Sequence, residues 1–286
     1  MESIAVVGFG DMGQEMVPHL ISAGYPVRVF DHDPGKLERA AELGAVTTSS
    51  AADAASGADV VLGLVMSDDI PGAYFGVTGI LAGAGSGALV LVASTTTPEL
   101  VRQIQSAAAE GTRVLDTPMV GGVRFAREAA LTFLVGSDNE SDNPRVDGVL
   151  SVLGKVRFVG GLGSGVAYKL ITNVAIMAAE AGIREALDLA DILGKDYETA
   201  LHLMAVGPMA PVVSRALDTT NPRPLRRSAE DDETLLSVVA SPEADLPISY
   251  AGAKRLWEAV TATPGYEPDF VDLTRKTTSR PRYRQQ

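Results

Sequence analysis

The sequence predicts an α/β protein in which a doubly wound parallel sheet is followed by an all-helical domain. Short apolar strands alternate with helical segments over about the first 160 residues, as in consecutive βαβ units. Residues 163–194 then form one long apolar segment without proline, which predicts a single helix. Only helical patterns follow it. We therefore expect two domains of different architecture.

The composition indicates a globular protein and narrows its partners. Of the 286 residues, 46% are hydrophobic and 21% are charged, and the formal net charge is −12. This charge disfavours nucleic acid and anionic membranes, since both attract clustered Lys and Arg. Cysteine is absent and the three histidines share no ligand spacing, so we expect no disulfide, no thiolate chemistry and no metal.

The sequence shows no export or membrane signal. The first residues, MESIAVVGFG, lack a basic region, and their apolar run is too short for a signal peptide. No uninterrupted apolar run approaches the ~18 residues that cross a bilayer. We expect a cytoplasmic protein that acts on a small molecule.

A glycine-rich turn joins the first strand, residues 4–7, to a helix expected over residues 11–23. In a Rossmann dinucleotide-binding fold, the first glycine allows the tight turn, the second the approach of a pyrophosphate, and the third the packing of helix on strand. The position between a strand and a helix makes the motif a predicted cofactor-binding turn. Its residues are Gly8, Phe9, Gly10, Asp11, Met12 and Gly13.

The second strand, residues 27–30, ends at Asp31, 18 residues beyond the glycine motif. A carboxylate there accepts hydrogen bonds from the adenosine ribose and repels a 2′-phosphate, so the sequence favours NAD over NADP. Two alternatives stay open. Asp31 could cap the following helix, although Asp33 is better placed to do so. His32 and Arg39 could accommodate a phosphate.

The remaining strands of the first domain end in polar or glycine-rich segments. Open α/β sheets bind ligands at the carboxyl ends of their strands, where this chain has Ser67, Thr95 and the loop 116–122. Paired Gly121 and Gly122 expose successive backbone N–H groups, which suit an anion. Further strands are expected at 45–47, 59–65, 88–93, 113–115, 131–135 and 156–159, and helices at 36–43, 51–56, 98–110 and 144–153.

The long helix carries a polar stripe on an otherwise apolar surface. Lys169, Asn173 and Glu180 stand at i, i+4 and i+11, on roughly one helix face. At ~1.5 Å per residue, its 28 residues from 166 to 193 span ~42 Å, enough to serve two domains. Taken alone, the stripe has a structural interpretation, in which Lys169 reaches solvent and Asn173 and Glu180 satisfy one another or a neighbouring loop. The ligand edge that precedes the helix favours a catalytic interpretation.

The predicted domains are a dinucleotide-binding domain at 1–162, a helical substrate and dimerisation domain at 163–276, and a basic flexible tail at 277–286. Further helices are expected in the second domain, with a connector at 221–227. They span 197–205, 209–217, 229–240, 248–263 and 269–276.

Four motifs together resemble the β-hydroxyacid dehydrogenase family, which includes 3-hydroxyisobutyrate dehydrogenase and tartronate semialdehyde reductase. They follow the family's order and spacing over nearly the whole chain. GFGDMG matches the family's GxGxMG, STTTP its hydroxyl cluster, DTPMVGG its substrate loop DAPVSGG, and Gly165, Lys169 and Asn173 its GxxxKxxxN helix. The resemblance implies a Rossmann domain with a helical partner domain, and NAD(P)-dependent hydride transfer at a CH–OH group.

By this resemblance, Lys169 would be the general acid and base on the substrate oxygen, and Asn173 would polarise that oxygen. The chemistry agrees, because a hydride that leaves or joins carbon must be accompanied by the hydroxyl proton. A Lys whose pKa is lowered by partial burial can carry that proton. The implied binding residues are Val65 and Met66 on the adenine side, Thr95 beside nicotinamide or substrate, and Val120, Gly121 and Gly122 around the substrate's carboxylate.

Two departures from the family pattern concern the substrate. Val120 replaces the substrate-loop serine, which removes a hydroxyl from the carboxylate site. The family's later KDL motif aligns with residues 230–232, EDD, so that Glu230 replaces a cation. Arg226 or Arg227 could substitute for it. We expect poor activity on hydroxyisobutyrate, tartronate semialdehyde and glyoxylate.

Two other functions compete with hydroxy-acid oxidation. Imine reductases share the architecture but usually place Asp or Tyr where Lys169 stands, so Lys169 counts against imine reduction. A nucleotide-binding module with little catalysis would fit the altered Val120 and Glu230. In the family that the chain resembles, the long helix commonly lies at a dimer interface, so a homodimer or homotetramer is expected.

Overall fold

The computed structural model describes residues 1–262 and 264–283 and divides into two compact units, Met1–Lys169 and Leu170–Gln286. The first is the expected α/β domain and the second is helical, which confirms the predicted fold class. The sequence placed the boundary at 162/163, before the long helix α9 (Ser164–Ile192). In the structure α9 starts inside the first unit, because Val166 on its first turn is fully buried in that unit's core.

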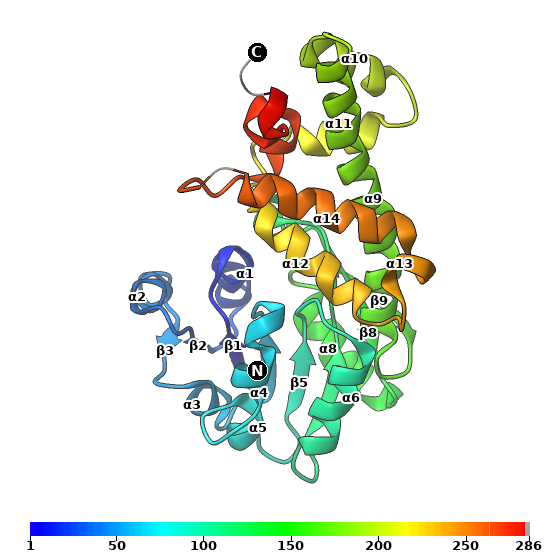
Figure 1. The fold of residues 1–286 in the computed structure, drawn as a ribbon. Coiled ribbons are helices and arrows are strands. Elements are labelled where there is room, and N and C mark those ends of the chain that lie inside the picture. The colour runs from blue at the N-terminus through cyan, green and yellow to red at the C-terminus, as the bar shows by residue number, and fades with distance from the viewer. Residues whose placement is uncertain (263, 284–286) are drawn as a thin grey trace. The chain divides into compact units, whose positions relative to one another are not determined.

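The first unit is built on one sheet (Figure 1). Among the described residues, its nine strands follow the order β3-β2-β1-β4-β5-β6-β8-β7, with β9 paired to β8. The first six pair in parallel, and Ile4 of β1 lies opposite Val27 of β2 and Val60 of β4. The strands are β1 (Ile4–Val7), β2 (Val27–Phe30), β3 (Val46–Thr47), β4 (Val60–Gly63), β5 (Leu89–Val92), β6 (Arg113–Asp116), β7 (Met119–Val120), β8 (Leu131–Gly136) and β9 (Gly154–Gly160).

One end of the sheet departs from the all-parallel arrangement that the sequence predicted. β8 runs antiparallel to both β6 and β7, and β9 pairs in parallel with β8. β7, a strand of two residues within the substrate loop, was not predicted. Its pairing, with Val120 opposite Thr132, holds the loop 116–122 along the sheet.

Each face of the sheet carries its own hydrophobic core, because successive side chains of a strand point to opposite faces. In β1, Ile4 and Val6 join one core, whereas Ala5 and Val7 join the other. The helices that cover the first core are α1 (Asp11–Ser22), α2 (Pro34–Glu42), α7 (Val123–Arg127) and α8 (Asn143–Leu150). The helices that cover the second core are α3 (Ala51–Ala55), α4 (Ile70–Tyr74), α5 (Ile80–Gly83), α6 (Pro98–Ala107) and the start of α9. Two 3-10 helices, η1 (Ser67–Asp69) and η2 (Glu140–Asp142), lie in loops.

The helix α9 is long and apolar enough to cross a membrane by length and composition alone. An 18-residue window of it has a mean hydropathy of 1.3, and 39% of that window is buried within the structure. Lys169 and Asn173 interrupt the apolar run, as the sequence shows. Glu180, Arg184 and Asp188 on its second half are buried and ion-paired within the helical unit. Such paired charges are typical of a helix inside a folded domain, whereas a bilayer would expose them to hydrocarbon.

The second unit packs shorter helices around the second half of α9, with Ile183, Leu187 and Leu256 at the centre of its core. α12 starts at Leu225, directly after Pro224 and four residues before the predicted Ala229. The predicted helix end at Thr263 lies outside the described residues. The elements are α10 (Tyr197–Val206), α11 (Ala210–Ala216), α12 (Leu225–Leu236), α13 (Pro242–Asp245), α14 (Pro247–Thr261), η3 (Phe270–Thr274), η4 (Lys276–Thr278) and η5 (Pro281–Tyr283).

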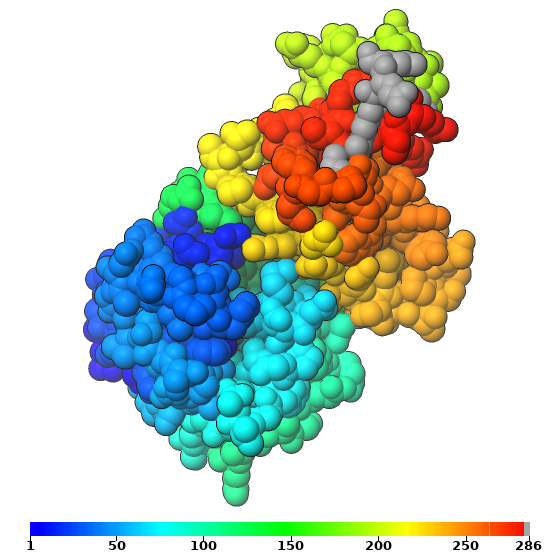
Figure 2. Space-filling view, turned by 60° about the vertical axis from the view of Figure 1, so that its left-hand side comes forward, coloured from blue at the N-terminus to red at the C-terminus, as the bar shows by residue number. Residues whose placement is uncertain are grey.

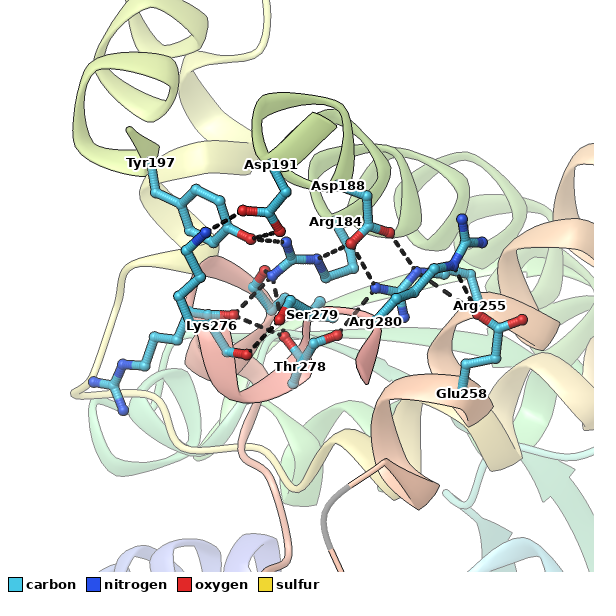
Figure 3. Close-up of polar contacts among 12 residues, drawn as sticks. Arg184, Asp188, Asp191, Tyr197, Arg255, Glu258, Lys276, Thr278, Ser279 and Arg280 are labelled. Carbon is cyan, nitrogen blue, oxygen red and sulfur yellow. Dashed lines mark hydrogen bonds and ion pairs between the residues drawn. The ribbon is translucent and has the colours of Figure 1, made fainter. Parts of the chain in front are cut away.

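The C-terminal segment, in red in Figures 1 and 2, packs on α14 in orange. The Arg255 guanidinium forms two hydrogen bonds with Asp188, at 2.8 and 3.0 Å, and donates to the Thr278 carbonyl at 3.0 Å (Figure 3). Lys276 pairs with Asp191. The sequence predicted a flexible tail from residue 277, yet Thr278 and Ser279 are buried, because these ion pairs hold the segment in place.

Candidate active site

The glycine motif forms the turn between β1 and α1. Gly8 has a φ of +98°, and a Cβ there would lie 2.5 Å from the carbonyl oxygen of Leu64 on the neighbouring strand's extension. Only glycine fits both conditions. Gly10 precedes α1 without a side-chain cap, and a Cβ on it would meet nothing within 4 Å. The first N–H groups of α1 are therefore approachable, and a helix N-terminus of this kind suits a pyrophosphate.

Phe9 cannot offer its side chain to a cofactor, because that side chain is fully buried in the core. Its backbone N–H donates to Asp31 Oδ2 at 2.7 Å. A second amide, that of Asp33, donates to Asp31 Oδ1 at 3.0 Å. Asp31 thus ties the end of β2 to the glycine turn, and Asp33 provides the helix cap through the Gly35 amide at 2.8 Å.

Two basic side chains, His32 and Lys36, lie beside Asp31. The Nδ1 atom of His32 lies 3.7 Å from Asp31 Oδ1, and the His32 side chain is 80% exposed. The Nζ atom of Lys36 lies 3.6 Å from the same oxygen. Lys36 was not among the predicted cofactor residues, although its position on the first turn of the helix after Asp31 is visible in the sequence. Arg39, which was considered as a phosphate ligand, pairs with Glu42 instead.

Polar groups collect where β4, β5 and β6 end. The hydroxyl of Ser67 donates to the Thr95 carbonyl at 2.9 Å, which links the segments after β4 and β5. The Ser94 and Thr117 hydroxyls are buried, and neither has a hydrogen-bond partner among the described residues. Buried polar groups normally find partners, so these two fit a site where a bound cofactor or substrate satisfies them. Val65, half-buried, packs on the core beside this edge.

The substrate loop runs from Asp116 through β7 to the start of α7. Gly121 has a φ of +123°, a conformation that favours glycine, and Gly122 precedes α7 without a side-chain cap. Val120 is 43% exposed at the edge of the sheet. The loop therefore presents backbone N–H groups and one apolar side chain.

Asp116 joins this loop to α9. Its Oδ1 atom accepts a hydrogen bond from the Gly163 N–H, and its Oδ2 atom accepts one from the Val166 N–H, both at 2.7 Å. Burial raises the pKa of Asp116, and these backbone N–H groups oppose that rise because they favour the carboxylate. Lys169 lies one turn beyond Val166 and is half-buried. From the sequence, Asp116 is identified only as the first residue of the substrate motif. No local pattern predicts that its side chain contacts α9.

The polar stripe of α9 separates into two parts. Asn173 is 5% exposed, and its Nδ2 atom has no hydrogen-bond partner among the residues that the structure describes. Glu180 pairs instead with Arg215 at 2.8 Å inside the helical unit, which overturns the idea that Asn173 and Glu180 satisfy one another. Asn173 remains a candidate substrate donor one helical turn after Lys169.

The residues that replace the family's KDL motif lie on α12. Asp231 pairs with Arg223 at 2.9 Å, and Asp232 is buried. Arg226, a suggested replacement for the missing cation, lies 3.3 Å from Glu267 and over the Trp257 ring. Its charge is thus already balanced by a carboxylate of its own unit.

A strand, a glycine turn and a helix N-terminus, followed by polar strand ends and a Lys on the next long helix, define a dinucleotide-binding oxidoreductase. Residues 3–162 match the model of the NAD binding domain of 6-phosphogluconate dehydrogenase. The chain belongs to the family of NAD(P)-dependent hydroxyacid dehydrogenases that includes 3-hydroxyisobutyrate dehydrogenase, and it is a dehydrogenase with an NAD(P)-binding domain.

Three similar proteins support this assignment. The 3-hydroxyisobutyrate dehydrogenase of Pseudomonas aeruginosa is 36% identical over 207 residues, 71% of this chain and 69% of its own. The NAD-dependent L-serine dehydrogenase of the same organism is 34% identical over the same shares of both chains. The solved structure of Mycobacterium tuberculosis 3-hydroxyisobutyrate dehydrogenase with L-serine has a TM-score of 0.78, at 27% identity, and covers 96% of this chain and 98% of its own.

Proposed function

We propose that this enzyme interconverts a β-hydroxy acid and its carbonyl or semialdehyde form, with NAD as the hydride carrier and Lys169 as general acid and base. One observation carries the proposal: the first turn of α9, which precedes Lys169, is hydrogen-bonded to the first residue of the substrate loop, Asp116. An ionisable amine is thereby tied to a loop that offers the backbone N–H groups of Gly121 and Gly122 to a carboxylate.

A dinucleotide held by the glycine turn and Asp31 would accept the hydride from the substrate carbon, or supply it, at its nicotinamide ring. In the oxidative direction, neutral Lys169 takes the hydroxyl proton while the carbon–oxygen bond gains double-bond character. Asn173 donates its Nδ2 hydrogen to the same oxygen. An unpaired buried donor costs about 1–3 kcal/mol, so a substrate oxygen that pairs with Asn173 removes a penalty that the free enzyme carries.

For the substrate, we propose a β-hydroxy acid with an apolar group larger than methyl. Val120 is exposed where the family has a serine, so we infer that backbone N–H groups alone hold the substrate's carboxylate. An apolar substituent of the substrate can then cover the exposed Val120 side chain. A series of 2-alkyl-3-hydroxy acids tests this, with L-serine as the polar member. We expect kcat/KM to rise with alkyl length by up to about tenfold per buried pair of methylenes. Best turnover of L-serine would contradict the proposal.

For the cofactor, we propose a preference for NAD. The carboxylate of Asp31 lies where the adenosine ribose is bound in this fold, and it disfavours a 2′-phosphate. Lys36 and His32 lie within 3.7 Å of Asp31 and reduce that discrimination. We therefore expect NAD to be preferred over NADP by about tenfold in kcat/KM, and by more in Lys36→Ala. Equal use of the two cofactors would refute the preference.

We also propose that the enzyme is a homodimer or homotetramer. The face of α9 that carries Tyr168, Ile171, Leu189 and Ile192 is half or more exposed, which is unusual for a helix of this hydropathy. A second copy of the chain would cover it. Light scattering at micromolar concentration should give a multiple of 29.8 kDa, whereas a monomer mass would refute the proposal.

The reaction itself is tested by mixing the enzyme with NAD, NADP and the hydroxy-acid series and following the absorbance of reduced nicotinamide. A parallel panel of cyclic imines with reduced cofactor separates this activity from imine reduction. We expect turnover on the hydroxy acids that depends on Lys169. Rapid imine reduction, or tight NAD binding without turnover on any panel member, would overturn the proposal.

A further inference from the structure

The carboxylate of Asp116 closes the N-terminus of α9 from a distance of 47 residues in sequence. Asp116 is fully buried, and both of its oxygens accept hydrogen bonds at 2.7 Å from the first turn, one from Gly163 and one from Val166. The same residue ends β6 and begins the substrate loop. A single side chain therefore fixes α9 against the strand from which the loop departs.

The surroundings of Asp116 are shaped around its carboxylate. A Cβ on Gly136 of β8 would clash with Oδ1, and a Cβ on Gly165 of α9 would lie 2.8 Å from Oδ2. Both neighbours are glycine, so the strand and the helix can approach the carboxylate closely. Any larger residue at either position would push α9 away from the loop.

The carboxylate also faces the positive end of a helix dipole. The N-terminus of a long helix carries roughly half a positive charge, which Asp116 neutralises. A helical side chain leans back over the turn that precedes its own Cα, and Asp116 is hydrogen-bonded to that preceding turn at Val166, three residues before Lys169. Two further charged groups near the start of α9 are Asp138, which accepts from the Leu162 N–H at 2.9 Å, and Arg102, which pairs with Glu99. Of the two acids, Asp138 is exposed and Asp116 is buried.

We propose that Asp116 is a positioning residue for Lys169: it fixes the register of α9 against the substrate loop, and its charge sets the pH at which the Lys169 amine loses its proton. The proposal rests on the proposed function for its kinetic consequence, but not for its effect on the amine. Without the negative charge, the helix dipole disfavours a protonated amine, so Lys169 loses its proton at lower pH.

The test compares Asp116→Asn, which removes the charge and keeps the shape, with Asp138→Asn as the matched control and Asp116→Glu, which keeps the charge and displaces it. The titration of Lys169 is read in the enzyme without substrate, from the pH dependence of its modification by an amine reagent, measured by peptide mass spectrometry. We expect the midpoint to fall by about half a unit to one unit in Asp116→Asn and to stay unchanged in Asp138→Asn. A merely structural residue would not move it.

The kinetic arm measures kcat and the dissociation constant of NAD in the same variants. We expect kcat to fall at least about tenfold in Asp116→Asn and Asp116→Glu, since small displacements of a proton carrier are costly, while NAD binding changes less than about twofold. Asp116→Glu should keep the wild-type midpoint of Lys169. An unchanged midpoint in folded Asp116→Asn, an equal shift in Asp138→Asn, or failure of both Asp116 variants to fold would overturn the proposal. If Lys169→Ala keeps its turnover, the catalytic role fails, yet a shifted midpoint still upholds the electrostatic one.

Discussion

A buried acid on α12 should make the stability of the helical unit fall as the pH rises toward neutrality. Asp232 is 1% exposed, and burial, with the nearby Glu180 and Asp231 carboxyls, raises its pKa from 3.8 to about 7, against the opposing charge of Arg223. The folded state therefore keeps a proton that the unfolded chain releases above pH 3.8. Stability from this group is fully present below about pH 4 and is lost as the pH rises through 7.

The magnitude follows from the two pKa values. A shift of about 3 units corresponds to about 4 kcal/mol, since each unit is worth ~1.36 kcal/mol. By pH 5, which is about one unit above the unfolded pKa, about 1 kcal/mol of this stabilisation has been lost. About 3 kcal/mol therefore remains to be lost between pH 5 and pH 8. Asp232→Asn has a similar shape and no titrating proton. Its free energy of unfolding should lack this fall.

Urea unfolding at pH 5, 6, 7 and 8 measures the effect. The fluorescence of Trp257, the single tryptophan of the chain, reports the helical unit because it lies on α14. Asp196→Asn is the matched control, because a backbone N–H of Thr199 lowers the pKa of Asp196 and the group stays ionised over this range. Relative to wild type, Asp232→Asn should gain about 3 kcal/mol between pH 5 and pH 8, and Asp196→Asn should gain nothing. Parallel curves for wild type and Asp232→Asn would refute the reasoning.

Three further substitutions follow from the geometry. Gly8→Ala should weaken NAD binding at least about tenfold in calorimetry, because the new Cβ would clash with the Leu64 carbonyl. Gly44→Ala is the control: Gly44 also has a positive φ, but a Cβ there would meet open space, so NAD binding should stay unchanged. Arg255→Ala should lower the free energy of unfolding by about 2–4 kcal/mol, since it removes two hydrogen bonds from the buried Asp188 carboxylate and leaves it only the longer ion pair with Arg184. Arg280→Ala, whose ion pair is exposed, should cost less than about 1 kcal/mol in the same urea titration. Val120→Ser should raise kcat/KM for L-serine and short hydroxy acids by roughly tenfold through one added hydrogen bond to the carboxylate, and equal values for the two enzymes would contradict that role.

Much of the first unit was predictable because its signals are local. The turn at Gly8 stands between an apolar strand and a helix in the sequence, and the structure places it there, with a positive φ at Gly8. The long helix was visible from composition alone. The antiparallel β8 was not, since strand direction depends on pairing with β6 and β7, which no local pattern encodes.

The contacts of the site and of the helical core that the sequence did not reveal join segments that are distant along the chain. Asp116 and Val166 lie 50 residues apart, and Arg255 and Asp188 lie 67 apart. Both pairs are buried, and their energy comes from a geometry that only the folded chain supplies. The buried Thr278 shows the same limit, because a basic terminal sequence resembles a solvated tail until its partners are in place.

The role of Lys169 is tested most directly by chemical rescue. Lys169→Ala removes the amine and leaves the glycine turn and substrate loop in place, so NAD binding should be retained. We predict that kcat falls by about 10²–10⁴-fold, the range of a lost general acid or base, and that added methylamine restores part of it in proportion to the free-base concentration. Turnover that survives the substitution would contradict the account.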